Sequence, residues 1–201
     1  MSRDGRDAPD PADSYREAIA IDAANPFAHA NLGHLVLWQR GPSREASAHF
    51  EKALASGRER EYVRRMQLAS LMNYSSPGTD AGLLRVVDEM RRNGEPIDES
   101  TRRYLFGLYS YAFNSPEELQ ELVAAIPPAD QIETIRTLYF GPDFDPSRVP
   151  LRDATIALLQ EAAGQPADAL ATWQGVQSML GPDDDGRVAQ AAKEAVKRLS
   201  E

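Results

Sequence analysis

The chemistry of three histidines, His29, His34 and His49, first suggests a site in this sequence. Imidazole nitrogens bind transition metals, but a two-histidine site on one helix needs a spacing of four residues. His29 and His34 are five residues apart, about 140° around a helix, so they face different directions. The spacing instead favours a packing position between two helices for His29 and exposed polar positions for His34 and His49.

Acidic residues supply two further candidates. The run Asp183–Gly186 has the composition of a calcium loop, but taking its glycine as the sixth loop position places Gly181 and Ala192 where ligands are required. We therefore expect this run to begin a helix, whose dipole favours carboxylates. Asp143 and Asp145 lie in a proline-rich segment, where a buried acid with a raised pKa would indicate catalysis and exposed acids would argue against it.

The sequence contains none of the linear motifs that would indicate an enzyme. The sequence has no glycine-rich phosphate loop, Gly-x-Ser-x-Gly elbow or His-Glu-x-x-His zinc helix. It also has no cysteine, which excludes disulfides, thiolate nucleophiles and cysteine-ligated metals. We expect no enzymatic activity, no cofactor and no metal. An enzyme with a carboxylate site assembled around Asp143 and Asp145 is an alternative.

Composition limits the partners that the chain can have. Its 201 residues are 42% hydrophobic, enough for one compact domain or a short solenoid. The formal net charge of -9 argues against a general nucleic-acid binder, because a face that binds the phosphate backbone needs excess positive charge. The sequence has no apolar run of membrane-spanning length and no secretion signal, so we expect a cytoplasmic protein without membrane contact.

Turn and cap signals predict about eleven helices and no strand. Helix starts are expected after Asp10, Asn25, Ser43 and Asp98, and Ser115 is expected to open a capping box. The resulting organisation is a disordered tail over residues 1–9, helical repeats over 10–140, a proline-rich turn outside helix over 141–150, and a C-terminal helix pair with a capping helix over 151–201.

The segment from Asn25 to Ala53 has the spacing of a helix-turn-helix repeat. It spells N-P-F-A-H-A-N-L-G-H-L-V, then a turn, then E-A-S-A-H-F-E-K-A-L. This stretch resembles the tetratricopeptide repeat (TPR) family, whose pattern is roughly W-x2-L-G-x2-Y followed by A-x3-F-x2-A. The matching residues are Leu32, Gly33, Ala46, Phe50 and Ala53, while His29 takes the Trp position and Val36 takes the Tyr position.

The resemblance implies an all-α, TPR-like α-solenoid of antiparallel helix pairs. It places Phe27, Ala30, Asn31 and His34 on a concave surface that faces the ligand. Asn31 matches an asparagine that bonds the peptide in carboxylate-clamp TPR domains. The lysines of that clamp are not matched here, and two arginines of the next helix, Arg64 and Arg65, are candidates to replace them.

A second candidate surface is the helix that begins after Asp98. Its five aromatic residues between Tyr104 and Phe113 exceed the needs of a one-sided apolar stripe. The helix is therefore either buried on most sides or it offers an aromatic groove to a partner. Burial is the favoured interpretation, and the tyrosine hydroxyl groups then need hydrogen-bond partners.

These patterns predict a non-enzymatic scaffold or adaptor that binds a protein or peptide segment. The candidate partner-binding residues are Phe27, Asn31, His34, Arg64, Arg65, Tyr104 and Tyr111. The first helix lacks a repeat partner and leaves Tyr15, Ile19 and Ile21 on an apolar flank, which favours a homo-oligomer or a complex subunit. An alternative follows from residues 169–184, which are similar to TPR segments of cytochrome c maturation proteins that hold apocytochrome tails in the bacterial periplasm.

Overall fold

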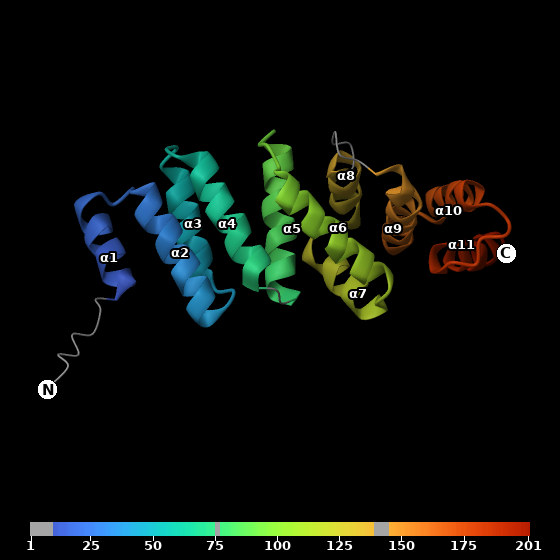
Figure 1. The fold of residues 1–201 in the computed structure, drawn as a ribbon, viewed down its shortest axis with the longest axis horizontal. Coiled ribbons are helices and arrows are strands. Elements are labelled where there is room, and N and C mark those ends of the chain that lie inside the picture. The colour runs from blue at the N-terminus through green and yellow to red at the C-terminus, as the bar shows by residue number, and fades with distance from the viewer. Residues whose placement is uncertain (1–9, 75–76, 139–144) are drawn as a thin grey trace, which may run out of the picture. The chain divides into compact units, whose positions relative to one another are not determined.

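The computed structural model describes residues 10–74, 77–138 and 145–201 (Figure 1). Within these ranges it contains eleven α-helices, one short 3-10 helix and no strand, which confirms the all-α prediction. The helices are α1 Pro11–Ile21, α2 Pro26–Arg40, α3 Arg44–Ala55, α4 Arg60–Tyr74, α5 Pro77–Arg92, α6 Glu99–Phe113, α7 Pro116–Ala125, α8 Pro128–Leu138, η1 Pro146–Arg148, α9 Val149–Ala162, α10 Pro166–Leu180 and α11 Arg187–Leu199.

The chain divides into two compact units, one ending at Thr79 and the other beginning at Asp80. This boundary lies inside α5, whereas the sequence patterns placed their divisions at residues 140 and 150. Residues 141–144 of the predicted proline-rich turn lie outside the described ranges.

Most predicted helix starts are confirmed by side-chain caps. Asp10, Asn25, Ser43 and Asp98 each accept a hydrogen bond from a backbone N–H of the first turn that follows. The capping box predicted at Ser115 is wrong, because its side chain accepts no such bond. The Ser115 hydroxyl instead donates to the Glu117 carboxylate, 3.4 Å away.

The prediction that residues 141–150 lie outside helix is wrong for its described end. Asp145 accepts a hydrogen bond from the backbone N–H of Ser147 and so caps η1, and α9 follows at once with Pro150 in its first turn. Proline is tolerated there because the first N–H groups of a helix have no intrahelical acceptor to lose.

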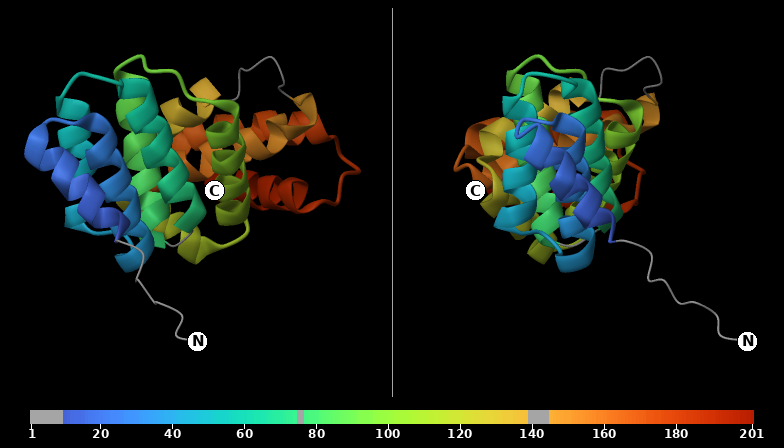
Figure 2. Two further views of the ribbon diagram at one scale, coloured as in Figure 1. Left: turned by 60° about the vertical axis from the view of Figure 1, so that its left-hand side comes forward. Right: turned by 90° about the vertical axis from the view of Figure 1, so that its left-hand side faces the viewer.

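The first unit is organised around the hairpin of α2 and α3. Gly33 on α2 lies directly against the backbone of Ala46 on α3, and the buried Phe50 fills the space beside it. Helix α4 packs on both α2 and α3, and α1 packs on α2 (Figure 2). Alanine and glycine at these contacts let the backbones approach, so the larger Phe50 and Val63 can close the core.

The second unit has its best-packed core where α9, α10 and α11 meet. Trp173 is fully buried among alanines of all three helices, and its indole N–H donates to Glu161 at 2.8 Å. Elsewhere in this unit the buried Gln131 donates to the carbonyl oxygens of Leu122 and Ile126. It thereby satisfies backbone groups freed where two prolines separate α7 from α8.

We predict that Gly33→Ala destabilises the first unit. The new Cβ would lie 3.1–3.2 Å from Phe50 Cε2, the Ala46 carbonyl oxygen and His49 Cβ, so α2 and α3 would have to separate. This cost of about 1–3 kcal/mol outweighs the gain of about 1 kcal/mol in helix propensity.

Urea unfolding followed by circular dichroism measures the effect, and Gly175→Ala in α10 is the matched control. A Cβ at Gly175 meets nothing within 4 Å, so this variant keeps only the propensity gain. An equal shift of both variants toward higher stability would contradict the close approach at Gly33.

Candidate functional site

The candidate site is a face made by α2 and α4. Phe27, Asn31, His34 and Trp38 follow one another at spacings of three and four residues along α2, so they form one stripe. Asn31 bonds Tyr62 on α4, and further along both helices His34 bonds Ser70. The two helices therefore run side by side in the same direction, with their side chains interlocked.

Asn31 links the two helices at one end of this face. Its amide nitrogen donates to the Phe27 carbonyl oxygen at 2.7 Å and to the Tyr62 hydroxyl oxygen at 2.9 Å. The Phe27 ring is 46% exposed and lies against the Tyr62 ring, with centroids 4.9 Å apart. Both amide hydrogens of Asn31 are thus used within the first unit, and its Oδ1 is left to accept from a ligand.

His34 occupies the middle of the face, and its hydrogen bonds define its tautomer. The Ser70 hydroxyl donates to the Met66 carbonyl oxygen at 2.6 Å, so its oxygen accepts from His34 Nδ1 at 2.8 Å. A neutral His34 then carries its proton on Nδ1 and presents Nε2 as an acceptor. The exposed position expected for His34 is therefore wrong: the ring is half-buried because Ser70 anchors it.

The two candidate arginines have different environments. Arg64 is buried and donates to Gln67 Oε1 at 2.9 Å, so its side chain does not lie on the open face. Arg65 is exposed, and its guanidinium carbon lies 5.9 Å from the centroid of the Tyr62 ring. Arg65 alone of this pair therefore adds a positive charge beside the aromatic pair of Phe27 and Tyr62.

Two members of the face were missed by sequence reasoning. Trp38 is 59% exposed and its ring lies 6.3 Å from that of His34. Its position four residues after His34 was a usable signal, because it continues the same stripe. Tyr62 carried no such signal, since only the packing of α4 beside α2 brings it to Asn31.

Tyr104 and Tyr111 belong to the second unit and form a separate candidate on α6. Leu105, Tyr109 and Ala112 bury one side of this helix, whereas Tyr111 is 61% exposed. The half-buried Tyr104 donates its hydroxyl hydrogen to Asp80 Oδ1 at 2.9 Å. The helix is thus buried on one side only, and the favoured expectation of burial on most sides is wrong for Tyr111.

The acidic candidates differ in their electrostatics. Asp143 lies outside the described residues. Asp145 is exposed, and hydrogen bonds from Ser147, followed by the charge of Arg148, lower its pKa. A general acid needs the opposite shift, so Asp145 lacks the property that the carboxylate alternative required.

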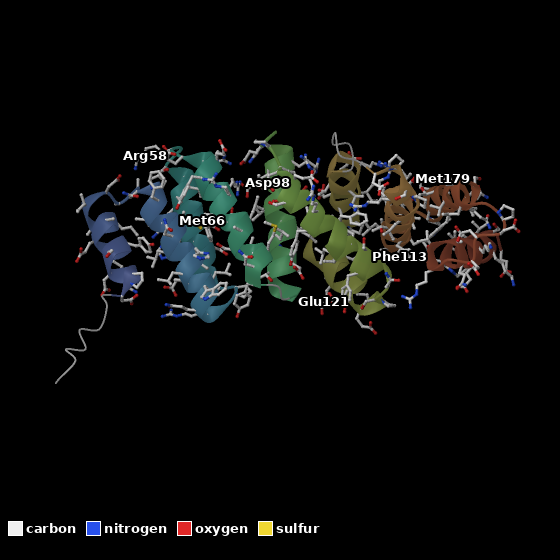
Figure 3. All side chains as sticks on the ribbon, viewed as in Figure 1. Arg58, Met66, Asp98, Phe113, Glu121 and Met179 are labelled. Atoms are coloured by element: carbon white, nitrogen blue, oxygen red, sulfur yellow. The ribbon has the colours of Figure 1, made fainter. Side chains whose placement is uncertain are left out.

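Asp80 shows the opposite shift. Burial raises its pKa, and the nearby Glu121 on α7 (labelled in Figure 3) raises it further, while the hydrogen bond from Tyr104 partly opposes both effects. The carboxyl group therefore ionises at a cost to the folded state.

The described ranges contain no group of three or more histidine, cysteine, aspartate or glutamate side chains placed to hold a metal. None of the helices in those ranges has the length and apolar character needed to cross a bilayer. Neither a family model, nor a curated protein, nor a solved structure matches the chain, so the TPR assignment stays a prediction.

We predict measurable coupling between Asn31 and Tyr62. In a double-mutant cycle of Asn31→Ala and Tyr62→Phe, the loss of one shared hydrogen bond should give a coupling free energy of about 0.5–1.5 kcal/mol. Chemical unfolding of the four proteins measures it. The control cycle pairs Asn31→Ala with Tyr74→Phe on the same helix and should be additive; equal coupling in both cycles would contradict the assignment.

We also predict that Asp80→Asn stabilises the second unit near neutral pH. Because the folded-state pKa is raised, ionised Asp80 destabilises the fold above that pKa, and this cost disappears below about pH 3.9, where the carboxyl group is protonated in both states. Asparagine keeps the acceptor for Tyr104, and the gain should be about a few tenths of a kcal/mol because water screens a half-buried site.

Thermal unfolding at about pH 7 and about pH 4 tests this prediction. The gain should shrink at the lower pH and should also be smaller in a Glu121→Gln background, which removes the neighbouring charge. A gain independent of both pH and Glu121 would mean that the carboxylate charge is not its cause.

Proposed function

We propose that the chain is a non-enzymatic scaffold or adaptor that binds a protein or peptide segment on the α2–α4 face. The observation that carries this proposal is the stripe of Phe27, Asn31, His34 and Trp38 beside Tyr62 and Arg65. It combines exposed aromatic rings with two polar side chains, Asn31 and His34. Each of these bonds a residue of α4 through a nitrogen and keeps a second polar atom that can accept a hydrogen bond.

The polar atoms of the face favour a ligand with a peptide-like backbone. Asn31 Oδ1 and His34 Nε2 are acceptors held in place by hydrogen bonds to α4, so they suit the N–H groups of an extended segment. Holding them in place lowers the entropy lost when a ligand binds.

The aromatic side chains would supply most of the affinity. Tryptophan, tyrosine and arginine are the residue types that dominate the energy of protein interfaces, and Trp38, Tyr62 and Arg65 provide one of each. Arg65 favours a carboxylate at the Phe27 end of the segment, in the role expected of a carboxylate clamp. The net charge of -9 supports a protein partner over a nucleic acid.

We further propose that the helices form a TPR-like solenoid of antiparallel pairs. Support comes from the first unit, where α2 and α4 run parallel and α3 packs on both of them. In a repeat array, the first helices of successive pairs occupy such neighbouring positions and line the inner surface. The α2–α4 face would then be the concave face of the array.

A second candidate role is that of a complex subunit joined through α1. Ile21 at the end of α1 is 90% exposed. An open hollow of about 390 Å³ lies between α1, the α1–α2 turn and α3. Its walls include Ile19, Ala23, Ala24 and Ala55. An exposed isoleucine and a partly apolar hollow are features that another chain, or a second copy, could cover.

Selection of peptides from a random display library against the purified chain tests the main proposal. We expect the enriched peptides to lose at least about tenfold in affinity for Trp38→Ala and for Phe27→Ala, because each variant removes an aromatic anchor. Both side chains are exposed, so the variants should fold.

Tyr111→Ala is the matched control, since it removes an equally exposed aromatic side chain from the second unit. Peptides that bind Trp38→Ala and Phe27→Ala as tightly as the original chain would refute the α2–α4 face as the site. Loss of binding only in Tyr111→Ala would move the site to α6.

A further inference from the structure

The first unit contains a pair of histidines in direct contact, on the side of α2 that faces α3. His29 Nδ1 and His49 Nδ1 are 3.0 Å apart, and the ring centroids are 5.3 Å apart. His29 is only 2% exposed, and its Nε2 lies 3.1 Å from the carbonyl oxygen of Ala23 in the turn between α1 and α2. The pair thus connects this turn, α2 and α3.

The hydrogen bonds of the pair determine where its protons lie. A carbonyl oxygen can only accept, so His29 Nε2 carries a hydrogen and donates it to Ala23. A neutral His29 then has a bare Nδ1, which must accept from Nδ1–H of His49. One arrangement of tautomers therefore satisfies both contacts, and it leaves His49 Nε2 without a hydrogen.

Added protons affect the pair in two stages. A first proton on His49 Nε2 leaves the Nδ1–H···Nδ1 hydrogen bond intact but places a positive charge in a half-buried position. A second proton would have to go to His29 Nδ1, where two N–H groups would face each other across 3.0 Å. That state loses the hydrogen bond and brings two like charges together, so the pair cannot hold it without separating.

The surroundings disfavour even the first proton. Burial lowers the pKa of His49, and His29, Lys52 on α3 and Arg16 on α1 lower it further, while Glu45 on α3 acts in the opposite direction. The carboxylate of Asp22 at the end of α1 is held by Arg58 at 2.8 Å, so a cation already neutralises it (Figure 3 labels Arg58). Arg16 and Glu45 are also in ion pairs, with Asp13 and Arg40 at 2.8 Å each, so burial and the neighbouring His29 are the main causes that disfavour the proton.

We infer that the His29–His49 pair is a proton-operated latch, which joins α2 to α3 at neutral pH and loosens this contact in acid. His49 is half-buried, so water reaches its ring, and the hollow lined by Ile19, Ala23, His29 and Lys52 lies next to the pair. This inference does not depend on the proposed peptide-binding function, because the pair lies on the opposite side of α2 from the Phe27–Trp38 stripe.

The direction of the pH effect follows from proton linkage. When a base has a lowered pKa in the folded state, the unfolded state binds more protons as soon as the pH falls below the ordinary histidine pKa of about 6.5. The contribution of the latch is therefore complete above that pH and declines as the pH falls toward the lower folded-state value.

Hydrogen exchange of the full chain, followed by mass spectrometry at about pH 7.5 and about pH 5 and corrected for intrinsic exchange rates, tests the latch. We expect a several-fold loss of protection in residues 26–55, which form α2 and α3, at the lower pH. His49→Gln should abolish this pH dependence, because its amide N–H can still donate to His29 Nδ1 but does not titrate. Residues of α9 to α11 should behave alike in both proteins.

The same acid-induced loss in His49→Gln, or no loss in the original chain, would overturn the inference. If His49→Gln does not fold, nitrogen NMR of the unmodified chain decides instead. We expect the hydrogen on Nε2 of His29 and on Nδ1 of His49 at neutral pH, with His49 titrating below its ordinary pKa. The opposite tautomers, or ordinary titration of His49, would overturn the latch.

Discussion

The approach of α2 to α3 at Gly33 is the constraint on which the rest of the first unit depends. A hydrogen in place of a side chain lets the backbone of Ala46 lie against α2, and Phe50 then fills the space alongside. This contact fixes the rotation of α2 about its own axis. One side of the helix consequently brings His29 to His49, and the other presents Phe27, Asn31, His34 and Trp38 to α4 and solvent.

The polar side chains of α2 differ in how many of their hydrogen-bonding groups are used inside the fold. This difference distinguishes a structural residue from candidate binding residues. His29 uses both ring nitrogens within the fold, as a buried group must. Asn31 donates to Phe27 on its own helix and to Tyr62 on α4, His34 bonds Ser70 on α4, and each keeps an acceptor on its open side. Burial thus commits one histidine to packing, while partial exposure leaves the other available to a ligand.

The second unit also brings its helices into close contact through small side chains, but with other residues. Alanines of α9, α10 and α11 enclose Trp173, and Glu161 accepts from both its indole and Arg198. The buried Gln131 ties α8 to the end of α7 and also accepts from the Tyr109 hydroxyl. In both units small side chains allow close helix contact, and a buried polar side chain satisfies carbonyl oxygens at a helix connection: His29 at the α1–α2 turn and Gln131 between α7 and α8.

The sequence by itself determined the helices of this protein, because caps, prolines and glycines act within a few residues: Asp10, Asn25 and Asp98 start helices where local rules place them. Its resemblance to a TPR repeat also singled out Phe27, Asn31 and His34. Only the tertiary structure decided that Tyr62 joins them, that Arg64 is buried, and that His29 meets His49 instead of His34. These outcomes depend on how separate helices pack, and local spacing holds no information about a contact between residues that lie twenty or thirty positions apart.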